Sequence, residues 1–395
     1  SRPRRAGRVR TTPNAAGVSG VRGVGSVNAG MGSPGTGRAD LSGLVDANGQ
    51  PLDHFTAALQ QEGITSLEQL LELPRLELLH TLRLFMEDLD IVLEAAARAG
   101  MPAICTARQM KRGASGVLPT FLPRLDRALG GGLTVGTVTE ICGAAGSGKT
   151  QMCLHVTAQA VLSDAQANVV YVDTEHSFSP KRLEQMLLAL AAHLQLADGA
   201  VVSALGRVHV LRPLSTAQLV EAVHAIGQLA AGPARVTLVV LDSVGALVRA
   251  EFDRDASMRR FEHLTALSAS LKRVAGALGA VVVVTNQVVG LFDEAAASCG
   301  ELEGQAGSKL QPSLGVTWAH NVNYRLLLQY MLRASSGARG GFRLDEAGAQ
   351  SRSIRIEKSP KSAQATVPIA IELGGLVEPP LENGAAAHVG TPRPT

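Results

Sequence analysis

The chain has 395 residues, of which 46% are hydrophobic and 18% charged, so it can bury the cores of two or three domains. Its formal net charge of +3 is too small to mark a nucleic-acid-binding protein unless the charges are clustered, and no apolar run is long enough to span a bilayer, so we expect no membrane partner. The four cysteines form neither a C-x-x-C pair nor a zinc spacing with histidine, which excludes those motifs and favours reduced thiols.

Residues 1–40 form the first segment, and their composition predicts a disordered basic tail. Five of the first ten residues are arginine, and Asp40 is the only acid of the segment. Such a Gly-, Arg- and Pro-rich stretch cannot offset the entropy that is lost on ordering. Three interpretations stay open: a solvated tail with no fixed role, an arm that contacts DNA phosphates, and an organelle transit peptide.

The rest of the chain divides into two predicted domains. Leucines at three- and four-residue spacing predict a small helical N-terminal domain over residues 41–99. Glycines and Pro102 predict a linker over 100–116. From 117 to 377, short apolar strands alternate with helical segments, which predicts an α/β domain with a mostly parallel central sheet. Residues 378–395 have few core-forming side chains and are expected to be a disordered tail.

The strongest motif is a phosphate-binding loop between a predicted buried strand and a predicted helix. The pattern G-x-x-x-x-G-K-T is complete and has the strand–loop–helix context that it requires. Glycines let backbone N–H groups surround phosphates, the helix N-terminus favours an anion, and the lysine reaches the β- and γ-phosphates. The sequence therefore predicts an ATP site formed by Gly143, Ala144, Ala145, Gly146, Ser147, Gly148, Lys149 and Thr150.

Three further predicted strands end in polar side chains that fit the same site. The run VTLVVLDS ends near Asp242, which we expect to hold Mg²⁺ together with Thr150 at the carboxyl edge of the sheet. The run NVVYVDTEHSF carries Glu175, which can polarise the attacking water; the alternative is that the Asp-Thr pair before it caps the next helix. The run AVVVVTNQ ends in Gln287, whose amide can sense the terminal phosphate.

Taken in order, these segments resemble the RecA-like recombinases, specifically the eukaryotic and archaeal strand-exchange branch and its paralogues. The resemblance covers residues from about 117 to 376 and is carried by LDRALGGGLTVGTVTEICGAAGSGKTQ, VVYVDTEHSFSPKRL, LVVLDSVGALVRAEF, VVVVTNQVVG and LGVTWAHNVNYRL. The stretches RAEFDRDASMRR and LGVTWAHNVNYRLLL are most similar to the X-ray repair cross-complementing paralogues. The resemblance implies a RecA-like P-loop ATPase core that binds ATP and Mg²⁺.

The resemblance also implies a role for each site residue. Glu175 and Gln287 match the family's catalytic glutamate and the residue that links nucleotide to a DNA loop, and Asp242 matches its metal-site aspartate. His176 stands where strand-exchange members usually have glycine. We expect its ring to crowd the attacking water and to slow hydrolysis.

Two DNA-binding loops are implied by the same resemblance. The first covers residues 249–260, where acidic residues stand among the basic ones. Two interpretations fit it equally well: contact with DNA phosphates, and a solvated loop of mixed charge. In the second, residues 288–312, a single lysine is set against four acids, a balance unfavourable for phosphate. The predicted DNA contacts are Arg249, Arg254, Arg259 and Arg260.

Protomers of the family join through a Phe-x-x-Ala segment in the linker, which adds a strand to the neighbour's sheet. Ile104 and Ala107 stand at the matching place, with isoleucine in place of the aromatic ring. They are the predicted docking residues. The alternative is an unstructured linker that happens to contain them.

Lys358 stands where strand-exchange members carry an aspartate before Ser-Pro, near the ATP of a neighbouring subunit. We hypothesise that its ammonium contacts the phosphates of that nucleotide and replaces a monovalent cation. The alternative is a solvated lysine in a loop that faces no neighbour.

Three functions fit the sequence. The first is a slow, DNA-dependent ATPase of the paralogue branch, which acts in homologous recombination and double-strand break repair. It would pair with a sister paralogue, bind single-stranded or branched DNA and assist the main strand-exchange recombinase. The second is a recombinase that forms filaments itself, and the third is an ATP-gated scaffold with little catalysis. The acidic second loop, Ile104 and His176 favour the first or third. We expect a nuclear location. Because the arginine-rich tail resembles a transit peptide, an organelle is the alternative.

Overall fold

The structure is a computed structural model, and it describes residues 41–73, 75–101, 106–108, 116–197, 199–252, 257–290, 310–312, 314–331 and 352–380. The predicted tail over 1–40 lies outside these residues. Within the described ranges, no helix has both the length and the apolar character needed to cross a bilayer.

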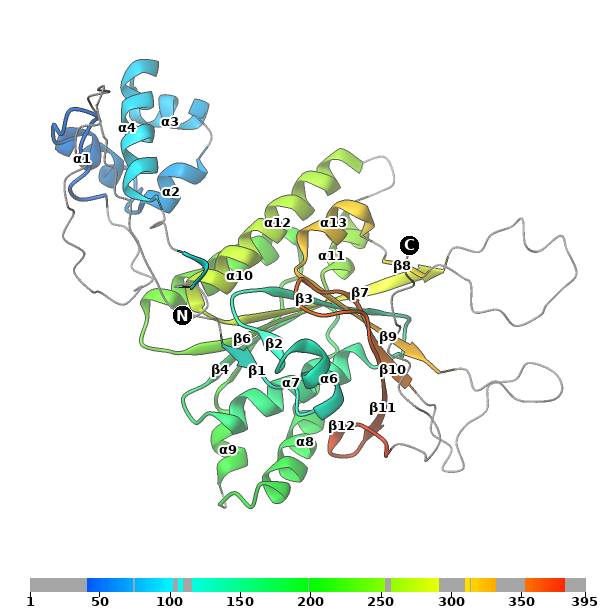
Figure 1. Ribbon diagram of the computed structural model, residues 1–395. Coiled ribbons are helices and arrows are strands. Elements are labelled where there is room, and N and C mark those ends of the chain that lie inside the picture. Colours follow the sequence, from blue (N-terminus) through cyan, green and yellow to red (C-terminus); the bar gives the residue numbers. More distant parts are fainter. Residues whose placement is uncertain are drawn as a thin grey trace, which may run out of the picture. The chain divides into compact units, whose positions relative to one another are not determined.

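The N-terminal part is helical, as the leucine spacing predicted (Figure 1). Its leucines pack into a core of their own, in which Leu59, Leu70, Leu78 and Leu89 are fully buried. Ser66 fixes the start of the second helix through a capping box: its hydroxyl accepts a hydrogen bond from the Gln69 N–H, and the Gln69 side chain accepts one from the Ser66 N–H. The helices are α1 (Asp53–Gln61), α2 (Leu67–Glu72), α3 (Arg75–Leu82) and α4 (Met86–Ala99).

The core is built on a ten-stranded sheet in the order β12-β11-β10-β9-β3-β7-β6-β4-β5, with β8 paired to β7. The strands from β9 to β5 in this order are parallel, and the C-terminal strands add an antiparallel extension. The predicted α/β core with a mostly parallel sheet is therefore confirmed. The strands are β3 (Val138–Gly143), β4 (Asn168–Asp173), β5 (Val208–Leu211), β6 (Val236–Asp242), β7 (Val281–Gly290), β8 (Leu310–Pro312), β9 (Tyr324–Tyr330), β10 (Arg352–Lys358), β11 (Thr366–Glu372) and β12 (Gly375–Val377).

Helices cover both faces of this sheet, so alternate residues of each central strand enter different cores. In β4, Val169 and Tyr171 pack under the helices of one face, whereas Val170 and Val172 pack under those of the other. The first face carries α6 (Pro123–Leu129), α7 (Lys149–Ser163), α8 (Pro180–His193) and α9 (Ala200–Leu205). The second carries α10 (Thr216–Gln228), α11 (Gly245–Glu251), α12 (Ser257–Leu278) and α13 (Gly315–Asn321), with the short 3-10 helix η1 (Leu229–Ala231) after α10.

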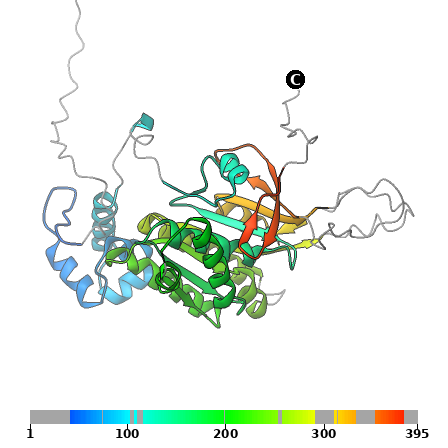
Figure 2. The same ribbon diagram turned by 90° about the horizontal axis from the view of Figure 1, so that it is seen from below.

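A small two-stranded sheet, β1 (Val117–Leu118) with β2 (Leu133–Thr134), flanks α6 at the start of the core. The chain end returns to this helix. The Glu378 carboxylate is 7% exposed and accepts hydrogen bonds from the N–H groups of Arg124 and Leu125, while the Arg124 guanidinium binds both Glu378 and the Pro379 carbonyl. The ordered core therefore continues beyond the predicted boundary at 377. Figure 2 shows the C-terminal strands, orange to red, beside the green helices of the core.

Candidate nucleotide-binding site

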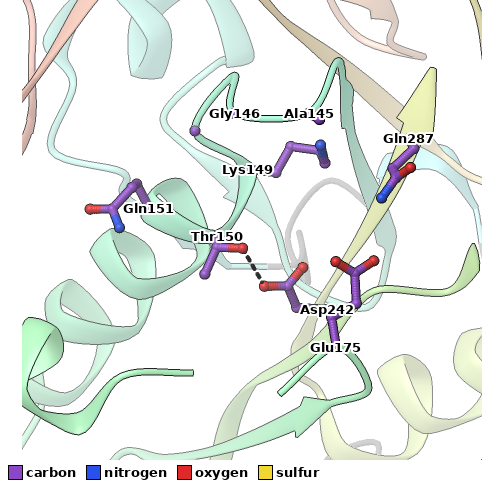
Figure 3. A pocket seen from close by; sticks show the side chains of 9 residues that line it. Ala145, Gly146, Lys149, Thr150, Gln151, Glu175, Asp242 and Gln287 are labelled. Carbon is purple, nitrogen blue, oxygen red and sulfur yellow. Dashed lines mark hydrogen bonds between the residues drawn. The ribbon is translucent and has the colours of Figure 1, made fainter. Parts of the chain in front are cut away.

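One pocket collects the polar residues that end the central strands. It has a volume of about 280 Å³ and lies at the carboxyl edge of β3, β4, β6 and β7, where open α/β sheets bind ligands. Figure 3 shows Lys149, Asp242, Glu175 and Gln287 grouped together, with Gln151 on the opposite side. The lining residues are Ala145, Gly146, Gly148, Lys149, Thr150, Gln151, Glu175, Asp242 and Gln287. The structure thus brings together residues that are up to 142 positions apart in the chain, from Ala145 to Gln287.

The phosphate loop has the glycines that its geometry requires. Gly146 and Gly148 have φ values of +75° and +108°, which side chains rarely allow. A Cβ atom at Gly143 would lie 2.5 Å from the carbonyl oxygen of Leu328, and one at Gly148 would lie 2.7 Å from Ile371. Because α7 begins directly after the loop at Lys149, its unpaired N–H groups face the pocket and favour an anion there.

Lys149 lies across the loop. Its Nζ donates hydrogen bonds to the carbonyl oxygens of Gly143 and Ala144, both at 3.0 Å. Burial lowers the pKa of this lysine, and the nearby carboxylates of Glu175 and Asp242 act in the opposite direction. An anionic phosphate is a stronger acceptor than these carbonyls, so the ammonium is well placed to exchange them for one.

Asp242 is held rigidly at the bottom of the pocket and is 2% exposed. The hydroxyl groups of Thr150 and Tyr171 donate to its Oδ2 at 2.8 and 2.9 Å, and the Thr285 hydroxyl donates to its Oδ1 at 2.5 Å. Mg²⁺ typically takes one or two carboxylates, hydroxyl or water oxygens and substrate phosphates. Thr150 and Asp242 fit that donor set, since they lie side by side at the start of the phosphate-facing helix (Figure 3).

Glu175 is held much more loosely, with 34% of its side chain exposed. Its Oε1 accepts a hydrogen bond from the Ser243 hydroxyl at 2.5 Å, and the Arg249 guanidinium lies 3.9 Å from the same oxygen. Ser243 is fixed in turn by Thr174, which donates its hydroxyl to the Ser243 carbonyl at 2.7 Å and accepts from its N–H. The carboxylate that faces the pocket is therefore tethered by two side chains from the end of β6 and from α11.

The loop around Glu175 bears on two expectations from the sequence, the cap of the next helix and the effect of His176. Asp173 is fully buried and accepts hydrogen bonds from the Ser177 and Phe178 N–H groups, whereas the N-cap of α8 is Ser179. The alternative that the Asp-Thr pair caps the next helix is therefore wrong. His176 has φ +54°, the left-handed conformation that explains a family preference for glycine, but its exposed side chain is not among the residues that line the pocket.

The structure places the remaining predicted residues away from this pocket. Arg249 lies in the last turn of α11 and approaches the pocket only through Glu175, and Arg259 and Arg260 lie in the first turn of α12. Arg254 lies outside the described residues, as does Ile104, while Ala107 is exposed. Their DNA-binding and docking roles remain predictions.

Lys358 lies in β10 and does not line the pocket of its own chain. Its Nζ donates to the carbonyl oxygens of Ala319, His320 and Val322 at 2.9, 3.2 and 2.7 Å, at the C-terminal end of α13. A lysine there satisfies carbonyls that have no partner within the helix. The hypothesis of contact with a neighbour's nucleotide stays a prediction, and such contact would cost these three hydrogen bonds.

Two supports of the site, one buried and one partly exposed, escaped sequence analysis. Glu140, in the middle of β3, accepts hydrogen bonds from Asn286, Trp318 and Arg325 and so ties β7, α13 and β9 to the strand that carries the phosphate loop. Arg182 donates to the Gln151 side chain at 2.8 Å and to the carbonyl oxygens that follow β11. The one signal in the sequence was the acid within an apolar strand, since a buried carboxylate needs partners.

Comparison with known proteins finds one family over the core of the chain. The family described as Rad51 matches residues 117–378. The "DNA repair protein RAD51 homolog 2" of Mus musculus is 30% identical over 342 residues, which cover 81% of this chain and 93% of the relative. The "DNA repair protein XRCC3" of Bos taurus is 31% identical over 290 residues, 69% of this chain and 82% of the relative. The "DNA repair protein RAD51" of Saccharomyces cerevisiae is 33% identical over 242 residues, 60% and 58% of the two chains.

Proposed function

The chain belongs to the Rad51 family of RecA-like ATPases, and from that premise we propose that it is an ATP-dependent, DNA-binding recombinase paralogue. Its role would be in homologous recombination and double-strand break repair, where it assists assembly of the strand-exchange filament as part of a hetero-oligomer. The observation that carries the proposal is the convergence of Lys149, Thr150, Asp242, Glu175 and Gln287 on one pocket.

Each residue of the pocket has a part in the proposed hydrolysis of ATP. Backbone N–H groups of the loop and the Lys149 ammonium hold the phosphates, and Thr150 with Asp242 would hold Mg²⁺, which supplies positive charge beside the phosphates. Glu175 orients a water, whose oxygen bonds to the γ-phosphorus while the bond from that phosphorus to the bridging oxygen of ADP breaks. The proton of the water passes to the Glu175 carboxylate, so the products are ADP and phosphate.

Slow turnover is part of the proposal, and it is supported by the contacts of Glu175 rather than by His176. His176 does not line the pocket, so crowding of the water by its ring has no support. Ser243 and Arg249 both hold Oε1 of Glu175, so the carboxylate cannot turn freely and has Oε2 left to orient a water. Hydrolysis is therefore slow until this contact opens.

Assembly with a sister paralogue is supported by the open edge of the sheet. β5 is the last strand on its side and pairs with β4 alone among the described strands. Its Val210 and Leu211 are exposed, as is Val220 on α10, the next helix along the chain. An extended segment such as the predicted one around Ile104 and Ala107 can add to such an edge through backbone hydrogen bonds, with its apolar side chains on these residues.

The proposed place within the family is the paralogue branch. Relatives at 30–31% identity include RAD51 homolog 2, RAD51 homolog 4 and XRCC3. The sequence-based assignment to the third X-ray repair cross-complementing paralogue therefore remains a proposal, as do a nuclear location, a preference for single-stranded or branched DNA, and cooperation with the main recombinase.

The test is steady-state phosphate release by the full chain, alone and with a sister paralogue, with and without single-stranded DNA at several salt concentrations. We expect slow release that DNA stimulates, and DNA binding that weakens as salt rises. Long filaments of the chain alone on DNA in electron micrographs would instead support a strand-exchange recombinase. Absence of DNA binding at low salt in the presence of ATP would support the ATP-gated scaffold.

A further inference from the structure

Arg249 belongs to the helix that leads into the predicted DNA-binding segment, and it faces the glutamate of the nucleotide pocket. It occupies the last turn of α11, and its Nη2 is 3.9 Å from Oε1 of Glu175. The guanidinium and the carboxylate are 37% and 34% exposed, so both can still reach other partners. The same Oε1 accepts the hydrogen bond from Ser243. One cation and one hydroxyl thus hold the carboxylate in its place at the pocket.

Gly245 leaves open the space that the Arg249 guanidinium occupies. A Cβ atom at Gly245 would lie 2.5 Å from Nη1 of Arg249, so the guanidinium occupies the space that a side chain would fill. The backbone of Gly245 is helical and its φ is not positive, so the conformation does not require glycine. Alanine is the better helix former at such a position. Because Nη1 is the far end of a flexible side chain, a Cβ atom at this position would displace the guanidinium without moving the backbone.

We propose that Arg249 is a positioning residue that holds Glu175 in a resting arrangement, and that a phosphate of bound single-stranded DNA releases Glu175 by taking the guanidinium. The inference rests on the proposed function, because it assumes that Glu175 orients the attacking water. A phosphate group binds a guanidinium through paired charge-assisted hydrogen bonds, which a carboxylate at 3.9 Å does not make. DNA binding would thereby be linked to hydrolysis through one side chain.

Because two partners that compete for one side chain must weaken each other's binding, the inference can be tested from DNA affinity alone, without measuring ATP hydrolysis. If Glu175 and DNA compete for Arg249, removal of the Glu175 charge must strengthen DNA binding by the amount that the pair contributes. For a half-exposed ion pair this is about two- to fivefold. In a chain with Arg249→Gln, the same Glu175→Gln change must have no effect on DNA affinity.

The experiment uses the full chain with Gly245→Ala, Arg249→Gln, Glu175→Gln and the Arg249→Gln/Glu175→Gln double variant. Fluorescence anisotropy measures affinity for an oligo-dT strand, and phosphate release measures turnover with and without that strand. Gly245→Ala keeps every charge but displaces the guanidinium. We expect its basal turnover to rise several-fold, its stimulation by DNA to fall towards one, and its DNA affinity to rise slightly or stay unchanged. Gly276→Ala in α12 is the matched control, since a Cβ atom there meets nothing within 4 Å, and it should behave as the parent does.

The outcomes separate this inference from the proposed function. Equal effects of Glu175→Gln on DNA affinity in the parent and in the Arg249→Gln chain would overturn the inference, whether or not the chain hydrolyses ATP. Parent-like basal turnover and stimulation in both Gly245→Ala and Arg249→Gln would overturn it as well. A parent that neither hydrolyses ATP nor binds DNA would instead overturn the proposed function.

Discussion

The two carboxylates of the pocket are held in opposite ways. Asp242 is 2% exposed and receives hydrogen bonds from the hydroxyl groups of three different elements, whereas Glu175 is 34% exposed and has one hydroxyl and a guanidinium 3.9 Å away. A metal site needs fixed ligand positions, and a step that responds to a second ligand needs a group that can move. The difference fits the proposal that the phosphate and metal side is preorganised and that control acts through the Glu175 side.

The largest expected effect comes from Glu140, the buried carboxylate that supports the phosphate and metal side of the pocket. Glu140→Gln removes the charge that pairs with Arg325, whose side chain is 11% exposed, and leaves that guanidinium without a counter-ion. We expect the free energy of unfolding to fall by about 3 kcal/mol, as when one partner of a buried ion pair is removed. Urea denaturation measures it. Trp318→Phe, which loses one hydrogen bond to the Glu140 carboxylate but leaves its charge opposite Arg325, should cost less, about 2 kcal/mol. Similar losses for the two variants would show that the charge is not the main term.

Loss of the phosphate contact comes next in size. Lys149→Ala removes the ammonium of the loop, and we expect affinity for ATP to fall by about 100-fold, since hydrogen bonds to charged groups contribute about 1.5–3 kcal/mol. Binding of a fluorescent ATP analogue measures the change. Lys181→Ala on the exposed start of α8 is the control and should bind as the parent does. Undiminished binding by Lys149→Ala would remove the phosphate-loop assignment.

A smaller effect sharpens the contrast between the two carboxylates. Tyr171→Phe deletes one of the hydroxyl donors of Asp242, and we expect a loss of about 1.5 kcal/mol in the free energy of unfolding, because the acceptor is charged but keeps its other donors. Burial and the nearby acids raise the pKa of Tyr171, so the hydroxyl remains a donor over the whole practical pH range. Glu175→Gln, at the exposed site, should change that free energy by less than about 0.5 kcal/mol. The reverse order in thermal or urea denaturation would contradict the assignment of rigid and adjustable sides.

The smallest effect is a pH dependence from His155 in α7. Its Nε2 lies 2.8 Å from the Thr120 carbonyl and its Nδ1 accepts from the Leu376 N–H, so the ring is buried in its neutral form, and burial lowers its pKa below the ordinary 6.5. The unfolded chain therefore takes up the proton first as the pH falls, and stability present above pH 6.5 is lost below it. Urea midpoints at descending pH measure this slope. His155→Gln should flatten it, and an unchanged slope would exclude His155 as its source.

Much of the fold and of the rigid side of the site could be predicted from sequence, because both rest on local patterns. The phosphate loop is contiguous, and the strand that ends in Asp242 is an apolar run with an acid after it. The donors of Asp242 could not be predicted, since Tyr171 and Thr285 reach it from two other strands that only the sheet order makes neighbours.

The adjustable side was harder to predict for the same reason. Arg249 was expected to contact DNA phosphate, and its approach to Glu175 depends on the turn between β6 and α11 and on the space above Gly245. His176 was interpreted from a family preference alone, whereas its effect depends on whether its side chain lines the pocket, and it does not. Contacts of this kind are set by tertiary geometry and leave no periodic trace in a sequence.

The most direct test of the account measures ATP affinity and ATP turnover together in Glu175→Gln. Because the amide keeps the shape of the side chain and the phosphate and metal contacts are made by other residues, affinity for ATP should stay within about threefold of the parent value. Turnover should fall by at least about 100-fold, the contribution expected of a positioned general base. Parent-like turnover in this variant, or loss of ATP binding with it, would contradict the division of the pocket into a binding side and a catalytic side.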